Sequence, residues 1–369
     1  MEKCAPPKPS ERDGPPLAAL KQSLSRHGWP LPQPPACTDS LLQPLADTGL
    51  AHWHVRLPHG SEDGAWLARL PKQSQLGLDA ASNLNYQVAC FTRAQASGHT
   101  PRLNDWLPCD ELLPRGGLVV EAIDGRSARL PSDLPAMTTA LASLHSLPLP
   151  ALEQRSPLLS PADPWRDMLD DVRAQARHLP DANLSRHSLP LIEKALSQLP
   201  SQLPVANAAV SLISFDAHPG NFLITPEGRA VLVDLEKCRY SLPGFDLAHM
   251  SLYTSTTWDL HSRAVLFIED LVALYQRWRA RMTESGRDTH WRNLMACRHA
   301  MWLWSLTWCA KWRAQQHQQI DRRHRGEDWS AQLSQAALVD HVADRVDHYL
   351  SAPIIQRVTD ELAELADAG

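Results

Sequence analysis

The pattern of apolar and polar positions divides the chain into a strand-rich front and a helical remainder. In the first third, apolar residues alternate with polar ones in short runs, which is the period of half-buried strands. Two such runs, 50–57 and 65–70, flank a polar segment with two glycines, which predicts a hairpin with a loop. A helix is predicted over 80–97, because Gly98 and then Pro101 supply its stop signals.

Two more strands, 106–113 and 117–123, are predicted on either side of a Pro-Arg-Gly-Gly turn. The apolar spacing then becomes helical, first over 134–147. Further segments are predicted as helices at 165–178 and 186–199, a strand–loop–strand unit at about 210–236, and successive helices over 245–367. We therefore expect an α+β fold with two lobes and a cleft between them.

Composition refines this organisation. The 369 residues suffice for two domains, and we predict a Pro-rich arm over 1–44 with one short helix, a strand-rich domain over 45–124 and a helical domain over 125–369. A net charge of −5 argues against a broad nucleic-acid surface. The seven scattered cysteines contain no C-x-x-C pair, and neither a signal peptide nor an apolar run of membrane-spanning length is visible. We expect a cytoplasmic protein that binds no membrane.

One stretch, 211–236, concentrates the candidate chemistry. Asp216 is followed five residues later by Asn221, then by an apolar strand, a Glu-Gly turn, a second apolar strand and Asp234. A hairpin between the two strands would return Asp234 beside the loop that carries Asp216 and Asn221. Two carboxylates and an amide form a set of hard oxygen ligands suited to Mg²⁺. Phosphoryl transfer needs such a set, because it uses a carboxylate for the acceptor and oxygen ligands for a metal on the phosphates.

The segment 214–221, Ser-Phe-Asp-Ala-His-Pro-Gly-Asn, resembles the catalytic loop of aminoglycoside phosphotransferases and of choline or thiamine kinases, which have a protein-kinase-like fold. Leu-Val-Asp-Leu-Glu at 232–236 is similar to the metal-binding segment of that family, and Gly-Phe-Asp-Leu-Ala at 244–248 to the motif after it. The resemblance implies a small nucleotide-binding lobe over 45–124 and a catalytic, substrate-binding lobe over 125–369.

Carried over position by position, the resemblance assigns four roles. Asp216 would be the catalytic base, Asn221 and Asp234 would hold Mg²⁺, and Asp246 would support the loop. His218, inside the loop, is read as a residue that braces it. ATP would be the phosphoryl donor.

The front of the chain resembles the family more loosely. Residues 48–55 are similar to the loop that covers the nucleotide, where Gly49 would let the backbone approach the phosphates. Arg69 stands where the family places a cation that grips phosphate, with Lys72 as the competing candidate.

Residues 119–125 resemble the segment between the lobes. The resemblance implies that the main chain there, at Glu121 and Ile123, bonds the edge of the adenine.

The acceptor is less constrained. Trp304, Trp308 and Trp312 share one face of a predicted helix, which indicates either helical core or a cation–π wall for an ammonium-bearing alcohol. The C-terminal helices also carry many Arg and His residues, unlike a trap for a polycation. We therefore predict transfer of the γ-phosphoryl group of ATP to a hydroxyl of a small molecule, such as a choline- or thiamine-like amino alcohol.

Two alternatives remain open. One is an aminoglycoside-type antibiotic kinase. The other is a nucleotide-binding pseudokinase with a regulatory role, because Ser214, Phe215 and Gln87 stand where the family usually has His, Gly and a carboxylate. The carboxylate would pair with Arg69, and the neutral amide of Gln87 would hold that guanidinium less firmly.

Overall fold

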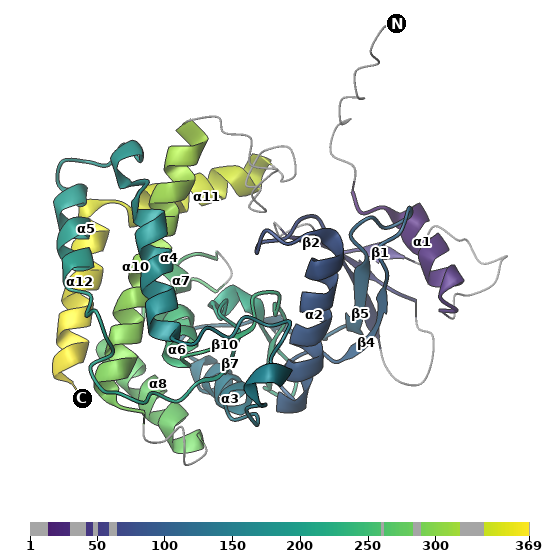
Figure 1. The fold of residues 1–369 in the computed structure, drawn as a ribbon, viewed down its shortest axis with the longest axis horizontal. Coiled ribbons are helices and arrows are strands. Elements are labelled where there is room, and N and C mark those ends of the chain that lie inside the picture. The colour runs from purple at the N-terminus through teal and green to yellow at the C-terminus, as the bar shows by residue number, and fades with distance from the viewer. Residues whose placement is uncertain are drawn as a thin grey trace, which may run out of the picture. The chain divides into compact units, whose positions relative to one another are not determined.

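The computed structural model describes residues 14–29, 42–46, 51–58, 65–259, 262–282, 289–317 and 336–368. The chain forms two compact units, shown in Figure 1. The first comprises Met1–Leu84, Asn104–Ala122 and Arg322–His341, and the second comprises Asn85–Leu103, Ile123–Asp321 and Val342–Gly369.

The first unit contains a five-stranded sheet with the order β1-β2-β3-β5-β4. Its strands are β1 (Gln43–Pro44), β2 (His52–Arg56), β3 (Trp66–Pro71), β4 (Leu103–Leu107) and β5 (Gly117–Glu121). β2 and β3 are antiparallel, with His54 opposite Arg69, so the predicted hairpin is confirmed. β5 pairs with the other edge of β3 and sets Leu118 opposite Arg69.

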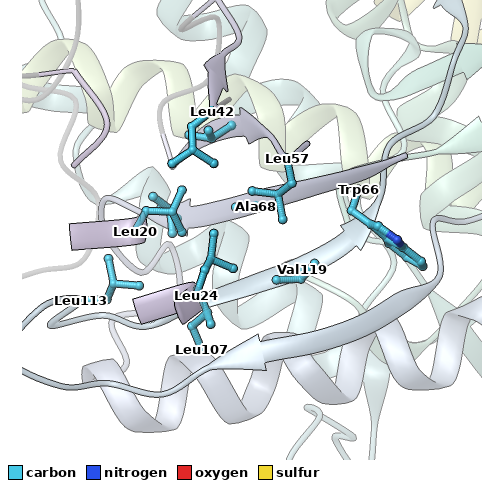
Figure 2. Close-up of a cluster of buried hydrophobic side chains, with 11 residues drawn as sticks. Leu20, Leu24, Leu42, Leu57, Trp66, Ala68, Leu107, Leu113 and Val119 are labelled. Atoms are coloured by element: carbon cyan, nitrogen blue, oxygen red, sulfur yellow. The ribbon is translucent and has the colours of Figure 1, made fainter. Parts of the chain in front are cut away.

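One face of this sheet is covered by helix α1 (Leu17–Arg26). Leu20 and Leu24, one helical turn apart, are fully buried among side chains of β2, β3 and β5, as Figure 2 shows. Strand alternation puts Trp66, Ala68 and Leu70 in this core and leaves Arg69 on the opposite face. The helix predicted in the Pro-rich segment is therefore part of the core of the first unit.

The strand predicted over 106–113 lies earlier in the chain, at Leu103–Leu107. Pro108 follows, and the Asp110 carboxylate then accepts hydrogen bonds from the backbone N–H groups of Leu112 and Leu113, at 2.8 Å each. These bonds hold a turn where the apolar residues alone predicted a strand.

The second unit is mostly helical, as predicted. Its helices are α2 (Ala80–Ala94, which begins in the first unit), α3 (Leu134–His145), α4 (Pro164–Ala176), α5 (Ser188–Ser197), α6 (Gly244–Ser251), α7 (Tyr253–Thr256), α8 (Ile268–Arg281), α10 (Trp291–His317), α11 (Ala336–Tyr349, which also begins in the first unit) and α12 (Ala352–Asp367). The long helix α10 packs against α4, α6 and α12, and α3 packs against α8 (Figure 1). Among the described residues, every helix is too short or too polar to cross a membrane.

Two small sheets in the second unit position the candidate chemistry. β8 (Phe222–Ile224) pairs with β9 (Ala230–Leu232) as the predicted hairpin, with β6 (Arg126–Ser127) at its edge. β7 (Ser211–Ile213) pairs antiparallel with β10 (Arg239–Ser241), a strand that the sequence pattern did not predict. The second pairing sets Arg239 opposite Ile213, directly before the loop that carries Asp216.

Candidate active site

The β8–β9 hairpin brings together the polar residues singled out in the sequence. Phe222 pairs with Leu232, and beyond this pair the backbone N–H of Val233 donates to the carbonyl of Asn221 at 2.9 Å. Asp234 is the next residue, so Asn221 and Asp234 lie at the same end of the hairpin. The side-chain amide of Asn221 also donates to the backbone carbonyl of Asp216 at 2.8 Å. The loop and the hairpin are therefore connected by hydrogen bonds.

The loop that carries Asp216 is supported by hydrogen bonds from its backbone to Asp246, whose carboxylate is fully buried. One oxygen, Oδ2, accepts the backbone N–H of Ser214, and the other, Oδ1, accepts that of Phe215, each at 2.7 Å. Oδ2 is also 3.1 Å from Nε2 of His145. Because the indole nitrogen of Trp278 can only donate, and lies 3.0 Å from Nδ1 of His145, the His145 proton is on Nε2 and points to Asp246.

Ser214 and Phe215 replace the residues usual in this loop, yet both have defined structural roles. The hydroxyl of Ser214 accepts the backbone N–H of Asp216 at 3.2 Å. Phe215 has a φ of +61°, in the left-handed region that favours glycine. Its ring is fixed on several sides, with the Arg239 guanidinium over one face and the rings of Phe245 and Trp304 edge-on. Tertiary packing thus imposes the conformation that glycine would adopt freely.

His218 also stabilises the backbone of this loop. Its Nδ1 accepts the N–H of Gly220 at 3.2 Å. This bond fits the role read for His218 in the sequence.

The Asp216 carboxylate lies beside a buried ammonium group and close to a histidine ring. Nζ of Lys237 is 2.8 Å from Oδ2, and Nδ1 of His249 is 3.9 Å from Oδ1. Burial alone would raise the pKa of Asp216, but the nearby Lys237, with His218 and His249, holds it well below its ordinary value. Burial lowers the pKa of His249 to about 4, so its ring is neutral at pH 7.

Lys237 and His249 were not identified from the sequence. Lys237 lies beyond the metal-binding motif, in a segment without periodicity, and His249 lies within an apolar helix pattern. Burial would lower the pKa of Lys237, but the carboxylates of Asp216, Glu236 and Asp234 raise it. The ammonium is therefore firmly protonated, in contact with Asp216 and under the electrostatic influence of two further carboxylates.

The donor set fits Mg²⁺. Because the amide nitrogen of Asn221 is used by Asp216, its carbonyl oxygen is the atom that could take a cation. Asp234 is half-buried beside it in the hairpin. Among the described residues there is no cluster of three or more His, Cys, Asp or Glu side chains that could hold a metal alone. Mg²⁺ is commonly bound by one or two carboxylates together with substrate phosphates, so this small oxygen set is appropriate.

The residues that the resemblance assigned to the nucleotide lie elsewhere in the chain. Gly49 is outside the described residues. In the first unit, Arg69 is only 4% exposed, and Nη2 lies 3.3 Å from Nδ1 of His52. Glu121 ends β5 in the same unit, whereas Ile123 belongs to the second unit.

The competing cation, Lys72, is also buried in the first unit. Its Nζ lies 5.5 Å from the centre of the Trp53 ring. Both cations thus belong to the first unit and have local ring partners.

Comparison with known proteins decides the family. Residues 51–284 match the model of the phosphotransferase enzyme family APH. The chain belongs to this family. The resemblance seen in the loop motifs is therefore confirmed. A comparison with curated proteins gave no match.

Solved structures of phosphotransferases share the fold. The chain is similar to a Ralstonia eutropha JMP134 protein proposed to be an aminoglycoside phosphotransferase, with a TM-score of 0.61, 13% identity and coverage of 92% of this chain and 98% of that chain. It is also similar to the choline kinase LicA of Streptococcus pneumoniae (TM-score 0.54, 13% identity, coverage 94% and 99%). A third is the Plasmodium vivax ethanolamine kinase (TM-score 0.55, 14% identity, coverage 88% and 85%). At these identities the comparison establishes the protein-kinase-like α+β fold.

In this phosphotransferase the tryptophans on one face of α10 have different surroundings. Trp312 is buried in the helical core, which is one of the two roles predicted for this face. Trp304 is only half-buried, and its ring lies 5.4 Å from that of Phe215 and 6.4 Å from that of His249. One tryptophan of the predicted wall therefore borders the loop of Asp216.

The second half-buried tryptophan of that face, Trp308, has a different neighbour. Its ring lies 6.1 Å from that of Trp258, edge-on, and Trp258 in turn stacks on Tyr349. Trp304 and Trp308, one helical turn apart on α10, therefore have different aromatic neighbours.

Proposed function

We propose that the protein transfers the γ-phosphoryl group of Mg²⁺-bound ATP to a hydroxyl group of a small molecule. The observation that carries the proposal is the Asp216 loop. Its backbone is fixed by the buried carboxylate of Asp246 and is tied through the Asn221 amide to the hairpin that carries Asp234. Holding a carboxylate and two metal-ligand candidates in fixed relation is what phosphoryl transfer requires of a protein.

In this mechanism Asp216 accepts a hydrogen bond from the acceptor hydroxyl and orients its oxygen toward the phosphorus. The low pKa of Asp216 means that it orients the hydroxyl in the ground state and takes the proton only as the new O–P bond forms. The oxygens of Asn221 and Asp234 would hold Mg²⁺. When bound, the metal neutralises charge on the phosphates.

We assign the nucleotide to the residues at the front of the chain. Arg69 would neutralise phosphate charge, the backbone at Gly49 would cover the phosphates, and the main chain at Glu121 and Ile123 would bond the adenine. The choline kinase LicA has been solved in complex with AMP, at a TM-score of 0.51 to this chain, which supports a nucleotide as ligand.

For the acceptor we propose an amino alcohol of the choline or thiamine type. A half-buried indole, Trp304, borders the loop and could face an ammonium group. Asp259 adds a carboxylate near the same loop, since its Oδ2 would lie 3.0 Å from a Cβ built on Gly220. Choline and ethanolamine kinases among the similar structures support the same class.

A second candidate is a nucleotide-binding protein without turnover, because Lys237 already pairs with the carboxylate that the acceptor would need. Release of ADP from Mg²⁺-ATP separates the two. The panel of acceptors would be choline, ethanolamine, thiamine, homoserine, simple sugars and aminoglycosides, with Asp216→Asn as control. ADP release with one acceptor, lost in the variant, supports the kinase. Thermal stabilisation by ATP without any release of ADP supports the second candidate. The absence of both ADP release and stabilisation would refute both candidates.

A further inference from the structure

Lys237 occupies a fixed position beside Asp216. Nζ lies 2.8 Å from Oδ2 of Asp216, and the two side chains are 17% and 14% exposed. The backbone around Lys237 is pinned as well. The N–H of Cys238 donates to Leu235 at 3.0 Å, and the carbonyl of Cys238 accepts the Tyr86 hydroxyl at 2.7 Å. The Lys237 ammonium therefore has a fixed position next to Asp216, unlike the ammonium of a mobile surface lysine.

The position also places Lys237 near the reaction. In an in-line transfer the acceptor oxygen lies between Asp216 and the phosphorus, with oxygen and phosphorus about 3–3.5 Å apart. A cation in contact with the Asp216 carboxylate is then within reach of the oxygens on the transferred group. An ammonium has three N–H donors in different directions, of which Asp216 takes one.

The ammonium of Lys237 lies where two negatively charged groups would meet during the reaction. The Asp216 carboxylate and the γ-phosphate are both negative, and at contact distance they repel each other. Asp234 and Glu236 add negative charge around the same ammonium. A lysine that touches both Asp216 and the phosphoryl group would offset this repulsion and would stabilise charge on the equatorial oxygens.

We propose that Lys237 is a catalytic residue that donates hydrogen bonds to the transferred phosphoryl group while it holds Asp216. This inference rests on the proposed function. The acceptor oxygen forms a bond to the γ-phosphorus as the bond from phosphorus to the bridging oxygen breaks, and ADP leaves with that electron pair. The hydroxyl proton passes to Asp216 and then to solvent, whereas Lys237 keeps its protons throughout.

Nucleotide affinity tests the contact directly. Calorimetric titration with Mg²⁺ would compare the β,γ-imido analogue of ATP with ADP, for the wild type and for Lys237→Met. Because a hydrogen bond to a charged group contributes about 1.5–3 kcal/mol, the variant should bind the ATP analogue roughly 10- to 100-fold more weakly. Affinity for ADP, which lacks the γ-phosphate, should stay within about twofold. Lys237→Arg should recover part of the loss.

Two controls separate this contact from other effects. Lys194→Met removes an exposed lysine on α5 and should change neither affinity. In an Asp216→Asn background, Lys237 loses its ion pair with Asp216, and Lys237→Met should still weaken binding of the ATP analogue. Unfolding midpoints show whether Lys237→Met is folded, and if it is not, Lys237→Arg and Lys237→Gln take its place.

Three results would overturn the inference. Equal weakening for ADP and the ATP analogue would mean a general effect of charge. No weakening for either would make Lys237 a counter-ion of Asp216 only. Loss of the effect in the Asp216→Asn background would mean that Lys237 acts through Asp216. Failure of the wild type to bind any nucleotide would instead refute the proposed function.

Discussion

The guanidinium carbon of Arg239 lies 3.7 Å from the centre of the Phe215 ring. Arg239 is 6% exposed and belongs to β10, whereas Phe215 directly precedes Asp216 in the loop. A cation over the face of a buried ring is favourable, and here it fixes a ring whose backbone has a positive φ. The two residues thus stabilise a loop in which the family more often has glycine.

This relationship predicts an unusual order of stability for two variants. Phe215→Ala and Phe215→Gly both lose the ring, at a cost of about 3–5 kcal/mol in the free energy of unfolding. Alanine keeps the strain of a positive φ, whereas glycine relieves it. We expect Phe215→Gly to be the more stable of the two in urea unfolding, because the left-handed conformation costs alanine about 1–2 kcal/mol and the flexibility of glycine costs only about 0.5–1 kcal/mol. Equal or reversed stability would show that the backbone is not strained.

Removing the support of the loop should affect both stability and activity. Asp246→Ala leaves the buried N–H groups of Ser214 and Phe215 without an acceptor, at about 1–3 kcal/mol each. We expect a lower unfolding midpoint and a lower rate of ADP release. Asp246→Asn, which keeps one acceptor oxygen, should lose activity with a smaller loss of stability. Asp360→Ala, at an exposed position on α12, is the control and should change stability by less than about 0.5 kcal/mol. A full rate in Asp246→Ala would contradict the supporting role.

The hairpin offers a matched test of the metal site. Asp234→Ala should abolish turnover at ordinary Mg²⁺, or shift the Mg²⁺ titration to much higher concentration, because it removes one of the two proposed protein ligands. Glu227→Ala alters an exposed carboxylate at the turn of the same hairpin and should leave the titration unchanged. A normal Mg²⁺ titration in Asp234→Ala would remove Asp234 from the metal site.

Stability should fall in mild acid because of buried neutral histidines. Burial lowers the pKa of His299 in α10 from 6.5 to about 4. Between these values the unfolded chain binds a proton that the folded chain does not, so the free energy of unfolding decreases as pH falls from 6.5 to 4. His299→Gln should reduce this dependence, measured as unfolding midpoints across that range. An unchanged slope would show that His299 titrates normally in the fold.

The sequence predicted the parts of the site that are local. The loop from Asp216 to Asn221 and the hairpin back to Asp234 are contained in one short stretch, and apolar runs with a Glu-Gly turn define its register. The short amphipathic stretch from Leu17 to Leu24 likewise predicted the helix in the Pro-rich arm. It did not reveal what the helix packs against, because that depends on a sheet far along the chain.

The residues that the sequence did not reveal reach the site through long-range pairing. β10 has three residues and no visible alternation, and only its pairing with β7 brings Arg239 to Phe215. Lys237 reaches Asp216, 21 residues earlier, through the same arrangement. Which charged side chain faces a carboxylate depends on such contacts, and local patterns do not encode it.

Transfer of the phosphoryl group itself tests the account most directly. ATP labelled at the γ-phosphate would be incubated with Mg²⁺, the wild-type protein and the acceptor panel, and the label would be followed into product. We predict label in one hydroxyl compound with the wild type, and a rate about 10²- to 10⁴-fold lower with Asp216→Asn, the usual contribution of a positioned base. Equal transfer by the two proteins would contradict the central role of Asp216.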